Sequence, residues 1–105
     1  MATEDRKRAA HRALVDRVLN GTGAAPEDLR ARAFHNADLP PPLRELIDKV
    51  ATRPTQTADA DFAAAEAAGY SQDQLFELVV CAAVGQSARL YEAGLAALAA
   101  AEEDA

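Results

Sequence analysis

Alanine dominates the apolar part of this 105-residue chain and supplies 27 of its 52 apolar residues. Valine, isoleucine, leucine, methionine and phenylalanine together supply only 22. A chain of this length forms one compact domain, and small domains bury their surface inefficiently. A core so rich in alanine contains little apolar side-chain volume. The composition therefore predicts either close helix packing through alanine or burial of apolar surface against a partner subunit.

The charge distribution excludes nucleic acid as a partner. Eleven basic and seventeen acidic residues leave a net charge of −6. Residues 1–20 carry five basic and three acidic side chains (+2), whereas the remaining chain carries six and fourteen (−8). Nucleic-acid-binding proteins need a strongly positive surface, which this chain does not offer beyond its first helix.

The sequence also predicts a cytoplasmic location. Charged residues follow the first few positions with no apolar stretch behind them, so we expect no secretory signal. The longest uncharged run, residues 78–88, has eleven residues, too few to span a bilayer. The excess of arginine over lysine and the abundance of alanine are typical of a bacterial protein from a GC-rich genome.

Apolar residues recur with helical spacing along the chain, and proline and glycine fall between the helical segments. The clearest pattern places Leu43, Leu46, Ile47 and Val50 on one face of a helix. The sequence predicts a single all-α domain with N-terminal helices in residues 1–38, a core in 39–101 and a frayed tail in 102–105. Its five expected helices span about residues 3–19, 26–36, 43–53, 57–69 and 71–101.

The last helix carries the strongest signals. Ser71, followed three residues later by Gln74, forms a capping box that predicts the helix start. Residues 75–84 are apolar nearly all round, and such a helix must be enclosed on every side. A few short helices cannot enclose it, so we expect a second subunit to cover this segment. Gly85 and Gly94 could each permit close approach of a neighbouring helix, and Gly85 could instead mark a kink.

Glu77 is the first candidate for chemistry because it interrupts this apolar run. A buried carboxylate must be paired or must become neutral through a raised pKa. Either state would make Glu77 a candidate acid/base or an ion-pair anchor, with Arg89 or Arg44 as its partner. The favoured alternative places Glu77 on the one solvated stripe of the helix, together with Gln74, Cys81 and Ala88.

Cysteine and histidine offer little chemistry in this sequence. Cys81 is the only cysteine, which excludes an internal disulfide and a cysteine-based metal cluster. Its neighbours are apolar, so we expect a buried structural cysteine with a raised thiol pKa. His11 is expected on the surface, and His35 near the end of its helix. Two histidines so far apart in sequence make a poor metal site, and we expect no metal and no cofactor.

Two segments carry a family resemblance. The sequence LPPPLREL at residues 39–46 is similar to an opening helix, and the stretch from Ala65 through Gly69 and Ser71 to Leu75 is similar to a helix junction of the form A-x-x-x-G-x-S-x-x-x-I. With the helix from Phe76 onward, residues 39–98 resemble the carboxymuconolactone decarboxylase and AhpD-like superfamily. The resemblance implies that residues 39–101 form an AhpD-like helical core within a homo-oligomer, often a trimer or hexamer.

The resemblance does not extend to the redox site of that superfamily. Its peroxidase members carry a Cys-x-x-Cys pair and a histidine, and the matching positions here are Pro54, Thr57 and Asp61. None of these side chains can perform thiol chemistry, so thiol peroxidase activity is not expected. A glutamate precedes the cysteine pair in those members, and Glu45 lies in a comparable helix.

Three hypotheses on function follow from the sequence. The chain could be a non-redox oligomeric scaffold or accessory subunit. It could instead be a lyase or decarboxylase that uses Glu77 or Glu45 as an acid/base in an inter-subunit pocket with Arg89 and Tyr91. The third hypothesis is a small helical module that docks on a larger protein. The first is favoured.

Overall fold

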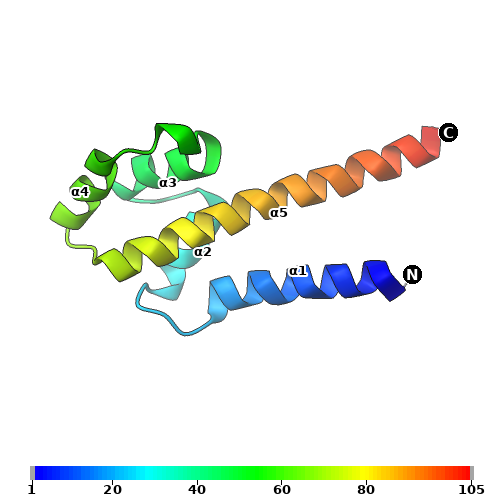
Figure 1. Ribbon diagram of the computed structural model, residues 1–105, viewed down its shortest axis with the longest axis horizontal. Coiled ribbons are helices and arrows are strands. Elements are labelled where there is room, and N and C mark those ends of the chain that lie inside the picture. The colour runs from blue at the N-terminus through cyan, green and yellow to red at the C-terminus, as the bar shows by residue number, and fades with distance from the viewer. Residues whose placement is uncertain (1, 105) are drawn as a thin grey trace.

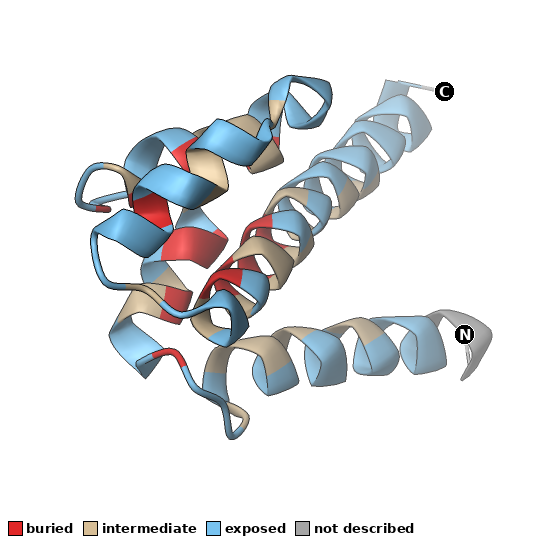
Figure 2. Ribbon diagram, turned by 60° about the vertical axis from the view of Figure 1, so that its left-hand side comes forward, coloured by how far each residue is buried: buried red, intermediate tan, exposed pale blue. Residues whose placement is uncertain are grey.

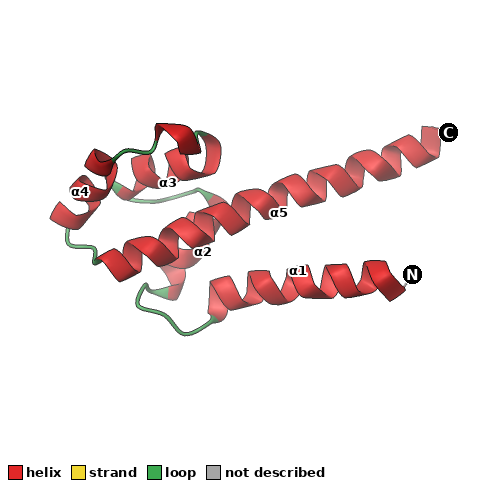
Figure 3. Ribbon diagram, in the orientation of Figure 1, coloured by secondary structure: helices red, strands yellow, loops and turns green. Residues whose placement is uncertain are grey.

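The computed structural model describes the backbone of residues 2–104 and the side chains of residues 5–104. Within these residues the fold is all-helical, as predicted (Figures 1 and 3). The elements are α1 (Ala2–Asn20), α2 (Glu27–His35), α3 (Leu43–Thr52), a short 3-10 turn (Pro54–Gln56), α4 (Asp59–Ala67) and α5 (Gln72–Asp104).

Local signals explain most helix ends. At the start of α5, Ser71 and Gln74 exchange the two hydrogen bonds of the predicted capping box. Gly69, with φ of 108°, ends the preceding segment in the left-handed region that glycine favours. The expected cap at Thr57 is wrong: α4 begins two residues later, where the Asp61 carboxylate accepts a hydrogen bond from the backbone N–H of Ala58. Helix α5 runs to Asp104, three residues beyond its expected end.

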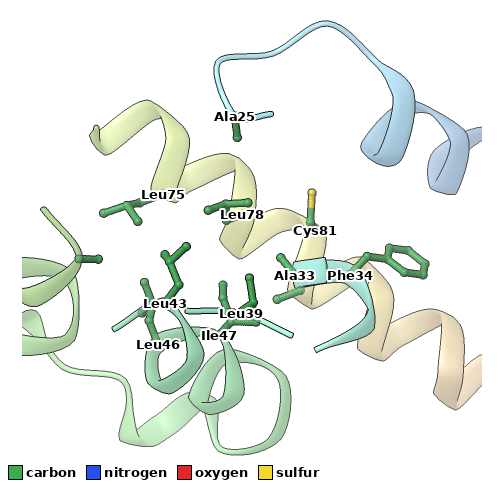
Figure 4. Close-up of a cluster of buried hydrophobic side chains, with 12 residues drawn as sticks. Ala25, Ala33, Phe34, Leu39, Leu43, Leu46, Ile47, Leu75, Leu78 and Cys81 are labelled. Atoms are coloured by element: carbon green, nitrogen blue, oxygen red, sulfur yellow. The ribbon is translucent and has the colours of Figure 1, made fainter. Parts of the chain in front are cut away.

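The core lies where α2 and α3 pack on the first half of α5 (Figures 1 and 4). The predicted apolar stripe of α3 is buried, and Leu43, Leu46 and Ile47 are fully enclosed. From α5, Leu75 and Leu78 point into the same cluster (Figure 4). Several remaining core positions are alanine, as the composition predicted.

Beyond this core, α1 and α5 continue together as a two-helix layer that makes the molecule 53 Å long (Figure 1). Buried residues are confined to the compact end (Figure 2). Between residues 86 and 104 every residue is exposed or only half-buried, and the same holds for residues 5–20. The two long helices therefore present much of their surface to the surroundings.

The chain encloses only one side of the apolar segment 75–84. Leu75, Leu78, Cys81 and Ala82 are buried, whereas Phe76 is 70% exposed. Val79 and Val80 are half-buried and Ala83 is exposed. The other side of this segment is open in the single chain, which is the condition that led us to expect a covering subunit.

The link between α3 and α4 makes a testable contribution to acid stability. Lys49 Nζ lies 2.9 Å from Asp61 Oδ1 and 3.1 Å from Oδ2. The hydrogen bond from Lys49, with a second from the Ala58 backbone, lowers the pKa of Asp61 below its ordinary value of 3.8. A group whose pKa is lower in the folded state stabilises the fold above its unfolded-state pKa, and this contribution disappears as the pH falls through the folded-state pKa.

We therefore expect Asp61→Asn to destabilise the protein at pH 7 and to have progressively less effect as the pH falls below about 4. Urea denaturation at pH 7 and at pH 3 measures the difference. Asp59→Asn is the matched control, because Asp59 is exposed in the same first turn of α4. An Asp61→Asn effect that is equal at both pH values would contradict the contribution of the charged pair.

Candidate functional site

Glu77 anchors the loop between α1 and α2. Its Oε2 accepts a hydrogen bond of 2.6 Å from the backbone N–H of Ala25, and Oε1 accepts one of 2.9 Å from that of Ala24. The loop passes so close that a Cβ atom on Gly23 would lie 2.9 Å from Glu77 Cδ. One turn earlier, Gln74 Nε2 donates to the carbonyl of Ala24 at 3.3 Å. Helix α5 thus positions this loop through polar contacts.

This arrangement differs from both environments considered for Glu77. The carboxylate is half-buried, but its hydrogen-bond donors are backbone N–H groups and not Arg89 or Arg44. A solvated stripe is also wrong, because Cys81, one turn further along, is buried. A carboxylate that accepts one backbone N–H hydrogen bond at each oxygen is a structural anchor.

Arg89 has a separate structural role at the end of α2. Its Nη1 donates a hydrogen bond of 2.7 Å to the carbonyl oxygen of Phe34, and Nη2 donates to Gln86 Oε1 at 2.9 Å. The last carbonyl groups of a helix need such donors. Arg89 is twelve residues beyond Glu77 on α5, which corresponds to about 18 Å of helix rise.

The other two candidates lie elsewhere. The ring of Tyr91 packs on that of His11 in α1, with centroids 4.5 Å apart, so His11 is not the solvated residue expected from the sequence. Glu45 is exposed on α3. Within one described chain, the structure does not bring Glu77, Glu45, Arg89 and Tyr91 together into one pocket.

A buried arginine is the feature that the sequence analysis missed. Arg30 in α2 is only 6% exposed, and its Nη1 donates to the carbonyl oxygens of Gly21 (2.6 Å) and Val18 (3.4 Å). Its Nε is buried and has no hydrogen-bond partner within the described chain. The signal was present in the sequence, because Arg30 precedes the buried Ala33 and Phe34 by three and four residues and so shares their helix face.

Arg30 lies at a surface pocket of about 220 Å³ between α1, α2 and α5, which we call the Arg30 pocket. It is lined by Arg17, Val18, Thr22, Arg30, Phe76, Glu77, Val80 and Cys81. Two arginines and one glutamate give this lining a formal charge of +1, and the glutamate is already engaged by the Ala24 and Ala25 N–H groups. The pocket is suited to a negatively charged group with an apolar stem.

Cys81 is buried, as predicted, and contributes no reactive thiol. Its Sγ contacts the carbonyl oxygen of Val18 at 3.7 Å. Burial raises the pKa of the thiol and Glu77 raises it further, while Arg30 partly opposes the shift. A thiol that stays neutral is a poor nucleophile.

Other site types also receive no support from the described residues. No three histidine, cysteine, aspartate or glutamate side chains among them gather as a metal site. None of the described helices has a stretch long and apolar enough to cross a bilayer. Neither a family model, a curated protein nor a solved structure matches this chain.

Proposed function

We propose that this chain is a non-redox, non-enzymatic helical scaffold or accessory subunit that self-associates through one face of the α1–α5 layer. The resemblance of residues 39–98 to the carboxymuconolactone decarboxylase and AhpD-like superfamily belongs to the same proposal, because it implies a homo-oligomer. The single observation that carries the proposal is a long, exposed and uncharged face of α5. The function of such a protein is to form an assembly with copies of itself.

This face follows a heptad spacing along α5. Residues recurring every three or four positions lie on one side of a helix. We call this set the exposed stripe, and all its members are exposed except Val80, which is half-buried. The exposed stripe consists of Phe76, Val80, Ala83, Ser87, Leu90, Gly94, Ala97 and Ala101. None of these residues is charged, although 27% of the whole chain is, so the stripe is suited to contact with another helix.

The exposed large apolar side chains all lie on this side of the layer. They are Leu14, Phe76, Leu90 and Leu98, between 48% and 70% exposed. In α1, Lys7 and Arg17 line grooves that also contain Leu98 and Phe76, respectively. Leu14 follows Lys7 by seven residues and precedes Arg17 by three, so it shares their face of α1. An apolar face spread over two helices marks an interaction surface.

The geometry does not favour the enzyme hypothesis. The candidate acid/base Glu77 is held by backbone N–H groups, and Arg89 caps α2. A general base must be free to accept a proton from a bound substrate. Glu77 and Arg89 instead hold a loop and a helix end of the same chain in place, whereas Glu45 is exposed.

Self-association is tested by substituting the middle of the exposed stripe. We expect the wild-type protein to be oligomeric at micromolar concentration, and Leu90→Arg to dissociate it into an 11 kDa monomer, because a buried unpaired charge is costly at an interface. Leu90 is 65% exposed in the single chain, so the substitution should leave the helix content of the protein unchanged. Light scattering and circular dichroism measure the two properties.

Ala96→Arg is the matched control, because Ala96 is exposed on α5 but lies about 120° around the helix from Leu90. We expect this variant to remain oligomeric. A wild-type monomer at tens of micromolar would overturn the proposal and would favour the module that docks on a larger protein.

A further inference from the structure

Resting on the proposed self-association, we infer that two copies pair their α5 helices antiparallel and that the partner's Glu102 enters the Arg30 pocket. A second copy of the chain is thus the occupant of the exposed stripe. Three features of the chain support this pairing: the order of residue sizes along the stripe, the acidic end of α5, and the unpartnered Nε of Arg30.

The residue sizes along the exposed stripe are self-complementary in the antiparallel direction. Phe76 and Val80 lie at one end of the stripe, Ala97 and Ala101 lie at the other, and Leu90 lies near the centre. Antiparallel pairing about the midpoint between Ser87 and Leu90 places Phe76, Val80 and Leu90 each against a smaller residue, as close packing requires. The facing pairs are Phe76 with Ala101, Val80 with Ala97, Ala83 with Gly94, and Ser87 with Leu90. Parallel pairing would instead oppose Phe76 to Phe76 and leave a void at Gly94.

The charges at the end of α5 favour the same direction. Glu102, Glu103 and Asp104 occupy the last turn, where the negative end of the helix dipole disfavours carboxylates. In an antiparallel pair this turn lies beside the first turn of the other α5, at the positive end of its dipole. That first turn also carries Asp73, so the favourable contribution of the second copy is that of its helix dipole.

Glu102 lies on the side of α5 that also borders the Arg30 pocket. Glu102 and Leu98 line one groove with α1, and Phe76 and Val80 line the Arg30 pocket, also beside α1. The two-fold axis that exchanges two antiparallel α5 helices is perpendicular to the plane containing them. The side of α5 that borders α1 therefore faces the same way in both copies. With Ala101 opposite Phe76, the partner's Glu102 lies next to the pocket.

The pocket has the chemistry to receive this carboxylate. Arg30 is 6% exposed and its Nε has no partner, while Arg17 lines the same pocket. Arginine pairs strongly with a carboxylate, and Arg17 is the exposed arginine of the two. The Glu77 carboxylate in the pocket lining is already bound by two backbone N–H groups. A symmetric pair contains this site twice.

Cysteine cross-linking tests the antiparallel register in a Cys81→Ala background. Subunits carrying Ala83→Cys are mixed with mass-tagged subunits carrying Gly94→Cys and are treated with a mild oxidant. We expect a covalent dimer with one subunit of each kind, because a disulfide requires Cα atoms within about 7 Å. Each variant alone should stay uncross-linked, since its two cysteines would lie about 16 Å apart along the pair.

The outcomes separate this inference from the proposed function. Covalent dimers from either single variant alone show parallel pairing and overturn the inference, as does an oligomer that gives no mixed cross-link. In both cases self-association stands. A wild-type monomer in light scattering overturns the inference and the proposed function together.

A charge exchange tests the pocket without cysteine. We expect Arg17→Glu and Glu102→Lys each to weaken the dimer by about tenfold, and the double variant to recover most of this loss. Glu103→Lys combined with Arg17→Glu is the control and should not recover it. Arg30 is left intact because its Nη1 holds the end of α1. Equal effects of Glu102→Lys and Glu103→Lys, with no recovery in either pair, would contradict the placement of Glu102.

Discussion

Replacing Gly85 with valine is expected to lower the free energy of unfolding by about 3 kcal/mol, near the upper end for an overpacked core. Gly85 is buried where α5 crosses the end of α2. A Cβ atom on Gly85 would lie 2.7 Å from the carbonyl carbon of Phe34 and closer still to its oxygen. These are backbone atoms, and the same oxygen accepts the Arg89 hydrogen bond. Neither helix can yield without breaking that contact.

Gly94 provides the control on the same helix. A Cβ atom there meets no atom within 4 Å in the single chain, so Gly94→Ala should raise stability by up to about 1 kcal/mol through helix propensity. Urea denaturation of both variants gives the comparison. If Gly85→Val and Gly94→Ala shifted the denaturation midpoint in the same direction and by similar amounts, the close approach at Gly85 would be wrong.

The contrast between the two glycines illustrates what the sequence could predict. Local signals such as the Ser71–Gln74 capping box and the amphipathic stripe of α3 depend on residues within a few positions, and the structure confirms them. The sequence left open whether Gly85 permits a close approach or a kink. The answer depends on which backbone lies opposite, and Phe34 is more than fifty residues away in the chain.

The partners of Glu77 could not be predicted for the same physical reason. Glu77 was correctly identified as unusual, because a carboxylate within an apolar run needs a partner. Its donors are the backbone N–H groups of Ala24 and Ala25. Every residue except proline has such a group, so the residue types in the sequence do not indicate which ones bind Glu77. Arg30 was missed although it shares a helix face with Ala33 and Phe34, because its acceptors are also backbone groups.

Assembly follows from the same uneven enclosure of α5. The first half of the helix has core residues on one side and an open apolar surface on the other, and the second half has no buried residue among those described. Alanine-rich helices bury little area per residue, so packing within one chain leaves this surface uncovered. A long helix with an uncharged exposed stripe is better enclosed when a second copy supplies the missing side.

Replacing Glu77 with alanine is expected to destabilise the protein by about 2–3 kcal/mol, because both backbone N–H groups lose their acceptor. Ala24 is exposed and its N–H can bind water, but Ala25 is buried. The larger part of the cost therefore comes from Ala25. Glu77→Gln should cost less, since the amide oxygen retains one of the two hydrogen bonds. Denaturation in urea measures these changes.

Hydrogen exchange distinguishes the loop anchor from a general loss of stability. In Glu77→Ala we expect the amide proton of Ala25 to exchange much faster. The exchange rates of amide protons in α3 should change only as far as global stability changes. Glu92→Ala is the matched control, because Glu92 is an exposed glutamate further along the same helix. It should change stability by less than about 0.5 kcal/mol. An Ala25 amide equally protected in Glu77→Ala and wild type would contradict the anchor and return Glu77 to the list of free carboxylates available for chemistry.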